Sequence, residues 1–149
     1  MPSNPDQSLY SVRTVARLAQ EPDLRVQSHG AIHLVMTMRL RSLLERADRD
    51  PIAELSARLC SVPAAIAALE LCEQVLGVWP EAFVVNRPCC MKLSPDEHTL
   101  AQIARSARAG DRASFSAVLD GFVRASRHER LFDATVRALV LLPVLIPRK

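Results

Sequence analysis

The sequence predicts an all-α protein, and three features of its composition support this fold class. Good helix formers, mainly Ala, Leu, Arg and Glu, dominate the chain, and four glycines among 149 residues disfavour a turn-rich β fold. The apolar fraction of 49% and the charged fraction of 23% are ordinary for a globular domain, and an aromatic content of 4% predicts an aliphatic core. We therefore expect one helical domain over residues 1–149, a single compact bundle of six to seven helices with an extended cysteine-containing connector. Residues 1–7 are expected to be a frayed lead.

Apolar residues at helical spacing predict a short amphipathic helix over residues 8–20 and a second helix from Ser28 or His29 to about residue 48. The second helix should bury one apolar stripe: Ile32, Met36, Leu40, Leu43 and Leu44. Its charged residues are expected in solvent: Arg39, Arg41, Glu45 and Arg46.

Two proline-containing signals start the next helices. Asp50 before Pro51 predicts an N-cap and a first helical position, and the helix should cover residues 51–59 with Ile52, Leu55 and Leu59 buried. A fourth helix should run from about residue 62 to 75 or 76. Its expected inward side chains are Ile66, Leu69, Cys72 and Leu76, and Gly77 suits a left-handed end.

The segment 78–85 is the least helical part of the chain, and we expect an extended connector there. Trp79 and Phe83 should anchor it to the core, and it leads into the run Arg87-Pro88-Cys89-Cys90. The connector thus joins the two halves of the bundle.

The sequence Ser94-Pro95-Asp96-Glu97 is the strongest local signal, because Ser94 and Glu97 have the spacing of a capping box. Capping accounts for both acidic residues of this motif. The helix should continue to about residue 108, followed by helices over 112–126 and from about 128 to Pro143. Expected inward side chains are Leu100, Ile103, Ala107, Phe115, Val118, Leu119, Phe122, Leu131, Phe132, Thr135, Val136, Leu139 and Val140.

Two motifs, Pro88-Cys89-Cys90 and Ser94-Pro95-Asp96-Glu97, resemble those of an uncharacterised family of small alphaproteobacterial helical proteins. Members carry a Pro-Cys-Cys run before a Ser/Thr-x-Asp-Glu helix start, as do Pro88-Cys89-Cys90 and 94–97 here, and a His-Gly pair that His29-Gly30 would match. Met91 stands where a third cysteine often sits in that family. The resemblance implies a helical fold and carries no activity.

The adjacent thiols Cys89 and Cys90 allow three interpretations. They could pack as small apolar side chains. They could be a redox or thiol-reactive site, because Arg87, Lys92 and the following helix start favour a thiolate. They could also hold zinc or iron together with His98 or with His29 and His33, which lie four residues apart.

Six arginines supply a candidate basic contact surface: Arg105, Arg108, Arg112, Arg124, Arg127 and Arg130. Scarce aromatic residues and interspersed acids favour solvated helix faces over a nucleic-acid interface. Phosphate-binding, dinucleotide, nucleophile-elbow and metalloprotease motifs are missing from the sequence, which argues against catalysis.

The net charge of +3 is mild, the N-terminus has no secretory pattern, and no apolar run approaches the ~20 residues that span a bilayer. We therefore expect a cytoplasmic, non-catalytic interaction or regulatory protein without a cofactor, with a protein partner or a homo-oligomer as its assembly. The alternative is a metal-binding or thiol-redox-responsive protein that uses the loop of Cys89 and Cys90.

Overall fold

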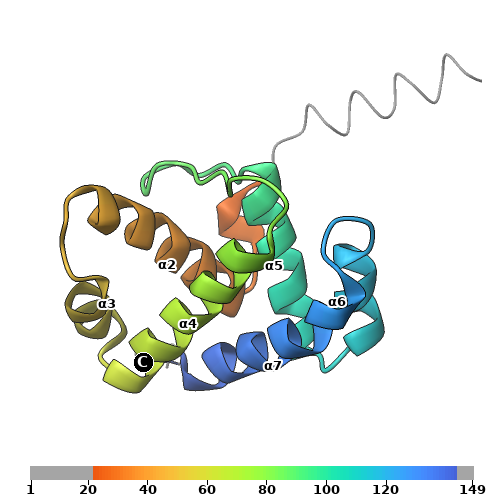
Figure 1. The fold of residues 1–149 in the computed structure, drawn as a ribbon. Helices are drawn as coiled ribbons and strands as arrows, with labels where there is room; N and C mark the ends of the chain where they lie inside the picture. Colours follow the sequence, from red (N-terminus) through yellow and green to blue (C-terminus); the bar gives the residue numbers. More distant parts are fainter. Residues whose placement is uncertain (1–21, 144–149) are drawn as a thin grey trace, which may run out of the picture.

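The computed structural model describes residues 22–143, and all regular structure in this range is helical (Figure 1). The elements are η1 (Leu24–Val26), α2 (His29–Arg46), α3 (Pro51–Leu59), α4 (Val62–Val78), α5 (Pro95–Arg108), α6 (Arg112–Leu119) and α7 (Ala125–Leu141). The predicted all-α class is confirmed. The frayed lead 1–7 and the predicted helix over 8–20 lie outside the described residues.

Two helices organise the packing of the bundle. Helix α4 lies against α7 and α3, whereas α5 lies against α2, α6 and α7 (Figure 1). A long connector arches over the bundle from the end of α4 to the start of α5 (Figure 1). Within residues 22–143, no helix combines the length and the apolar character needed to cross a membrane.

Side chains cap the N-termini of five of the six α-helices between residues 22 and 143, which is why these helices begin where they do. Each cap accepts a hydrogen bond from a backbone N–H of the first turn and satisfies a group that the helix itself cannot pair. The capping residues are Ser28, Asp50, Ser61, Ser94 and Asp111. The predicted caps Asp50 and Ser94 are confirmed, and so are the predicted bounds of α3 and α5.

Three predicted helix boundaries are wrong. Helix α6 ends at Leu119 and not near residue 126, because Gly121 adopts a φ of 89° and turns the chain. Helix α7 consequently begins at Ala125, three residues before the predicted start. Gly77 does not adopt the left-handed conformation predicted for it and lies inside α4, which ends at Val78.

Four apolar side chains that were expected in the core are exposed instead. The exposed fractions are 49% for Leu43, 42% for Ile52, 41% for Ile66 and 75% for Val140. In α4 the reason is visible in its buried face, which is built mainly from small residues. The chain buries Ala64, Ala65, Ala67, Ala68, Leu69, Leu71, Cys72 and Val75 there. Small side chains let α4 approach its neighbours closely, so the larger Ile66 is left on the outside.

Arg39 is the largest correction to the expected surface, because it is 1% exposed and not in solvent. Its side chain extends from α2 to the carboxylate of Glu97 on α5. A buried guanidinium needs such a partner, and the partner lies 58 residues further along the chain.

Candidate functional site

A buried ion pair forms the base of the connector between α4 and α5. Arg39 Nε donates to Glu97 Oε2 at 2.6 Å, and Arg39 Nη2 donates to Glu97 Oε1 at 3.0 Å. Both side chains are 0% exposed. Removing two charges from water is unfavourable, and such a pair is stable only if the geometry is good and the remaining hydrogen-bonding groups are satisfied.

The same two side chains satisfy backbone groups of the connector. Arg39 Nη1 donates to the carbonyl oxygen of Cys90 at 2.7 Å, and Arg39 Nη2 donates to that of Lys92 at 2.9 Å. Glu97 Oε1 accepts from the backbone N–H of Ser94 at 2.9 Å, which completes the predicted capping box. Arg39 and Glu97 therefore connect α2, α5 and the turn that contains Cys89 and Cys90, called the cysteine turn below. Helix capping alone does not account for Glu97.

Asp96 fixes the other end of the connector, so capping does not account for this residue either. Its Oδ1 accepts from Trp79 Nε1 at 3.0 Å, and its Oδ2 accepts from the backbone N–H of Val84 at 2.7 Å. Ser94 Oγ donates to the carbonyl oxygen of Val84 at 2.5 Å. Trp79 and Phe83 lie with ring centroids 5.2 Å apart and pack on the core as predicted.

The outer part of the connector is also held by backbone pairing. Leu24 N–H donates to the Met91 carbonyl at 2.7 Å, and Leu93 N–H donates to the Pro22 carbonyl at 2.8 Å. Asn86 Nδ2 donates to the Lys92 carbonyl at 2.7 Å. Beyond these contacts the connector exposes two large apolar side chains, Val84 at 56% and Met91 at 42%. A segment without regular secondary structure is thus fixed at its base and presents side chains at its surface.

All four cysteines are free thiols, and they differ in their exposure to solvent, from exposed to fully buried. Cys89 is exposed and Cys90 half-buried in a turn in which Cys90 N–H donates to the Arg87 carbonyl at 2.9 Å. Cys60 is exposed. Cys72 is buried in α4, and this burial raises the pKa of its thiol to about 12. Cys89 is therefore the accessible member of the pair in the connector.

The predicted metal ligands are not gathered at one point. Among residues 22–143, no group of three or more His, Cys, Asp or Glu side chains could hold a metal ion together. His29 and His33 do meet, with their Nε2 atoms 2.9 Å apart on α2. Arg39, which contacts the cysteine turn, lies ten positions after His29, about 15 Å further along the helix. His98 is in the first turns of α5, where burial lowers the pKa of its imidazole.

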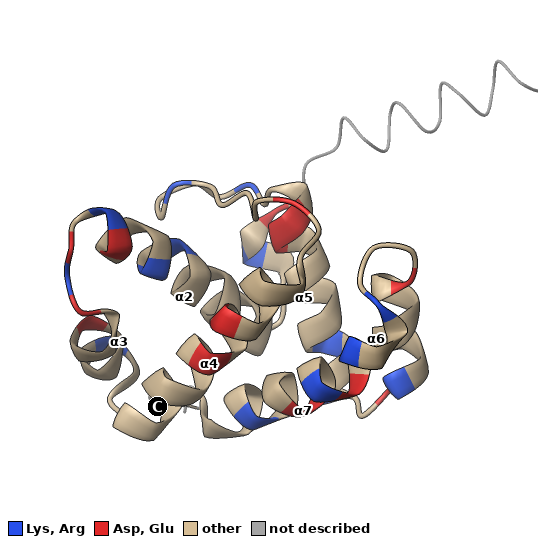
Figure 2. Ribbon diagram, viewed as in Figure 1, with Lys and Arg blue, Asp and Glu red and all other residues tan. Residues whose placement is uncertain are grey.

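The six predicted contact arginines are all exposed, and acidic residues are interspersed with them (Figure 2). Arg112 forms an ion pair with Glu129 and lies over the Phe132 ring at 4.2 Å from the ring centroid. Arg127 and Arg130 line a shallow hollow beside Glu73. Arg105 and Arg108 belong to the last turn of α5. The six side chains are therefore distributed over the end of α5 and the starts of α6 and α7.

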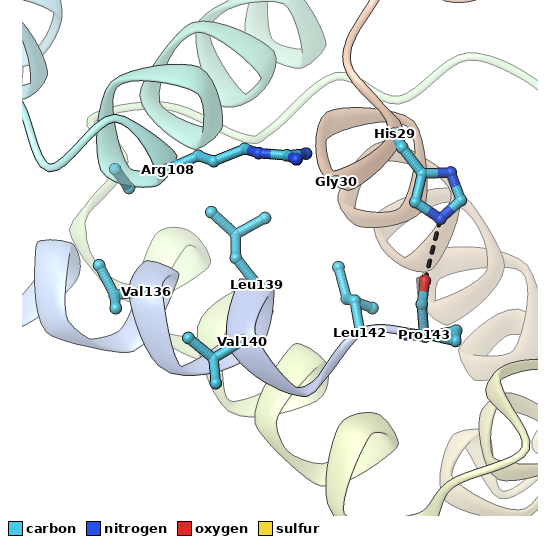
Figure 3. Close-up of a pocket in the computed structure, with 9 residues that line it drawn as sticks. His29, Gly30, Arg108, Val136, Leu139, Val140, Leu142 and Pro143 are labelled. Atoms are coloured by element: carbon cyan, nitrogen blue, oxygen red, sulfur yellow. Dashed lines mark hydrogen bonds between the residues drawn. The ribbon is translucent and has the colours of Figure 1, made fainter. Parts of the chain in front are cut away.

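A cleft of about 460 Å³ lies where the start of α2, the end of α5 and the end of α7 meet (Figure 3). Val136, Leu139 and Leu142 supply apolar walls, and the Arg108 side chain reaches across from α5 (Figure 3). At one end His29 Nε2 lies 3.0 Å from the Pro143 carbonyl oxygen. Sequence reasoning missed this cleft because three segments distant in the chain form it, and no local motif marks their meeting point.

Comparisons with protein-family models, with curated proteins and with solved structures gave no match to this chain.

Proposed function

We propose that this chain is a cytoplasmic, non-catalytic interaction protein whose contact surface is the connector of residues 79–94. The observation that carries the proposal is the buried Arg39–Glu97 pair with its hydrogen bonds to the connector backbone. Segments of this length without secondary structure are uncommon within compact domains, and those that occur are usually either functional or linkers.

Pre-organisation is the physical reason for a role in binding. Fixing the backbone of one mobile residue costs about 1–2 kcal/mol, and association must supply that free energy whenever a flexible loop orders on a partner. Here Arg39, Asp96 and Ser94 already hold the backbone in place. A partner would meet a surface that needs little further ordering.

The chemistry of the exposed side chains suggests the kind of partner. Val84 and Met91 are apolar and exposed, and Arg87 and Lys92 are exposed cations on the same segment. Basic segments mark the outer part of the connector in Figure 2. Such a surface is complementary to a protein segment that combines apolar and acidic side chains. With few residues involved, the interface would belong to the small, transient class.

The test is recovery of bound protein from the native cell with matched variants. Met91→Ala combined with Arg87→Glu should lose the bound protein, because both contacts are removed without touching the buried network. Ile66→Ala with Arg58→Glu is the control, since Ile66 is 41% exposed and Met91 42%, and both arginines are exposed. Equal recovery with the two double variants, or a chain that remains a lone monomer, would contradict the proposal.

A thiol-responsive role is the second candidate, and the exposure of Cys89 on a fixed turn favours it. In this role the Cys89 thiolate would attack the disulfide of oxidised glutathione, form a mixed disulfide and release one glutathione thiolate. Cys89→Ser should then abolish a change in partner recovery after oxidation, whereas Cys60→Ser, which removes another exposed thiol, should not. An unchanged oxidative response in Cys89→Ser would exclude this role.

A further inference from the structure

The pair His29 and His33 lies apart from the connector and brings three potential metal ligands together. The two Nε2 atoms are 2.9 Å apart, and the Pro143 carbonyl oxygen lies 3.0 Å from His29 Nε2 (Figure 3). The ligands come from the first turns of α2 and from the chain just after α7. We propose that these three atoms bind one divalent transition-metal ion of the nickel or copper class.

Hydrogen bonds alone cannot satisfy all three of these atoms well. A carbonyl oxygen only accepts, so the contact with Pro143 requires a hydrogen on His29 Nε2. That nitrogen then cannot accept from His33, and its single hydrogen must serve both the carbonyl oxygen and the His33 nitrogen lone pair. A metal ion in place of that hydrogen would bond to all three atoms at once.

The separations also agree with a coordination sphere. Imidazole nitrogens bind these metals at about 2.0–2.1 Å, and two ligands at right angles around such an ion lie about 2.9–3.0 Å apart. The observed separations are 2.9 Å between the nitrogens and 3.0 Å from nitrogen to oxygen. Right-angle geometry is typical of tetragonal Cu²⁺ and Ni²⁺ sites, which imidazole ligands suit. Water would fill the remaining positions, because both histidines are only half-buried.

The packing around the site shows how the carbonyl reaches the helix. Gly30 directly follows His29, and a Cβ atom added there would lie 2.6 Å from Leu139 Cδ2. The absence of a side chain at this position lets the start of α2 approach the end of α7 closely. A bound ion would therefore link the two helices and stabilise the folded state as its concentration rises.

The test is titration of the untagged full chain with NiCl₂, followed by calorimetry. Cys60, Cys89 and Cys90 are replaced by serine in every sample, so that accessible thiols do not compete for the ion. One ion should bind per chain, and His33→Asn should weaken binding roughly tenfold or more. His98→Asn, which changes another half-buried histidine, is the matched control and should bind as before.

A second measurement separates loss of the site from loss of the fold. Circular dichroism should show the same helix content for both variants, and NiCl₂ should raise the midpoint of thermal unfolding only when His33 is present. Absence of saturable binding to the parent protein would overturn the proposal. Equal affinities of folded His33→Asn and His98→Asn would overturn it as well.

Discussion

Replacement of Arg39 by methionine is the most informative perturbation of this fold. The guanidinium makes two hydrogen bonds to Glu97 and one each to the carbonyl oxygens of Cys90 and Lys92. Methionine fills similar apolar space but leaves the Glu97 carboxylate buried without its cation. We expect Arg39→Met to lower the free energy of unfolding by about 3–5 kcal/mol, the usual effect of breaking a buried ion pair from one side.

A double variant shows where this energy comes from. In Arg39→Met with Glu97→Met the stranded charge is gone, and buried pairs replaced by apolar residues are often no less stable than the original. Here Glu97 also accepts from Ser94 N–H, and the Cys90 carbonyl still loses its donor. We therefore expect partial recovery only, short of the parent by about 1–3 kcal/mol for the groups left unpaired.

Urea unfolding followed by tryptophan fluorescence is a suitable assay, because Trp79 is the sole tryptophan and donates to Asp96 at the base of the connector. The midpoint should fall in Arg39→Met and rise part of the way back in the double variant. A loss below about 1 kcal/mol in Arg39→Met, the range of an exposed pair, would refute the role assigned to the buried network.

Three further predictions concern the thiols and the histidines. Cys60 caps the end of α3 with a φ of 52°, a backbone conformation that favours glycine. Cys60→Gly should therefore raise the free energy of unfolding by about 1 kcal/mol in a urea titration, and no gain would contradict this. Under native conditions iodoacetamide should modify Cys60 and Cys89 and spare Cys72, because Cys72 is buried and the pKa of its thiol is raised to about 12. Mass spectrometry of the peptides checks this, and early modification of Cys72 would contradict its burial. Burial lowers the pKa values of His33 and His98 below the ordinary 6.5, so the unfolded chain binds more protons than the folded chain near this pH. The free energy of unfolding, measured in the presence of EDTA, should therefore fall as the pH drops through 6.5. The slope should be smaller in His33→Asn, by well under the limit of about 1.4 kcal/mol per pH unit that one group can contribute, and an unchanged slope would contradict this.

Local signals in the sequence predicted those parts of the fold that depend on neighbouring residues. Asp50 before Pro51 and the capping box of Ser94 and Glu97 act within one helical turn, and the bounds of α3 and α5 follow from them. The turn at Gly121 is equally local. The aspartate–glycine pair at this turn is a local signal for the end of α6, whereas the apolar spacing beyond it predicts a longer helix.

Burial could not be predicted as well, because it depends on distant residues. Ile66 fits a helical stripe as well as Leu69 does, and only the close approach of the neighbouring helices decides that alanines form the buried face of α4. Arg39 resembles any surface arginine of an amphipathic helix. Its partner Glu97 lies 58 residues away, and no spacing rule connects the two.

The candidate site shows the same division between local and distant information. Position and composition identified the connector with Cys89 and its anchor Trp79 from the sequence. The acceptors that hold it, Asp96 and Glu97, were assigned to helix capping, since a carboxylate in a first turn gives no sign of a second partner. The cleft beside His29 could not be predicted, because it exists only once α2, α5 and α7 are assembled.

Hydrogen exchange of the connector amides tests the central claim most directly, namely that residues 79–94 form a pre-organised surface. Val84, Cys90 and Leu93 donate their amide hydrogens to Asp96 and to the carbonyl oxygens of Arg87 and Pro22. Their exchange in the free protein should be slowed well below the rate of an unstructured peptide, and Arg39→Met should remove most of this protection at Cys90. Exchange of all three amides at the unprotected rate in the parent protein would contradict the account.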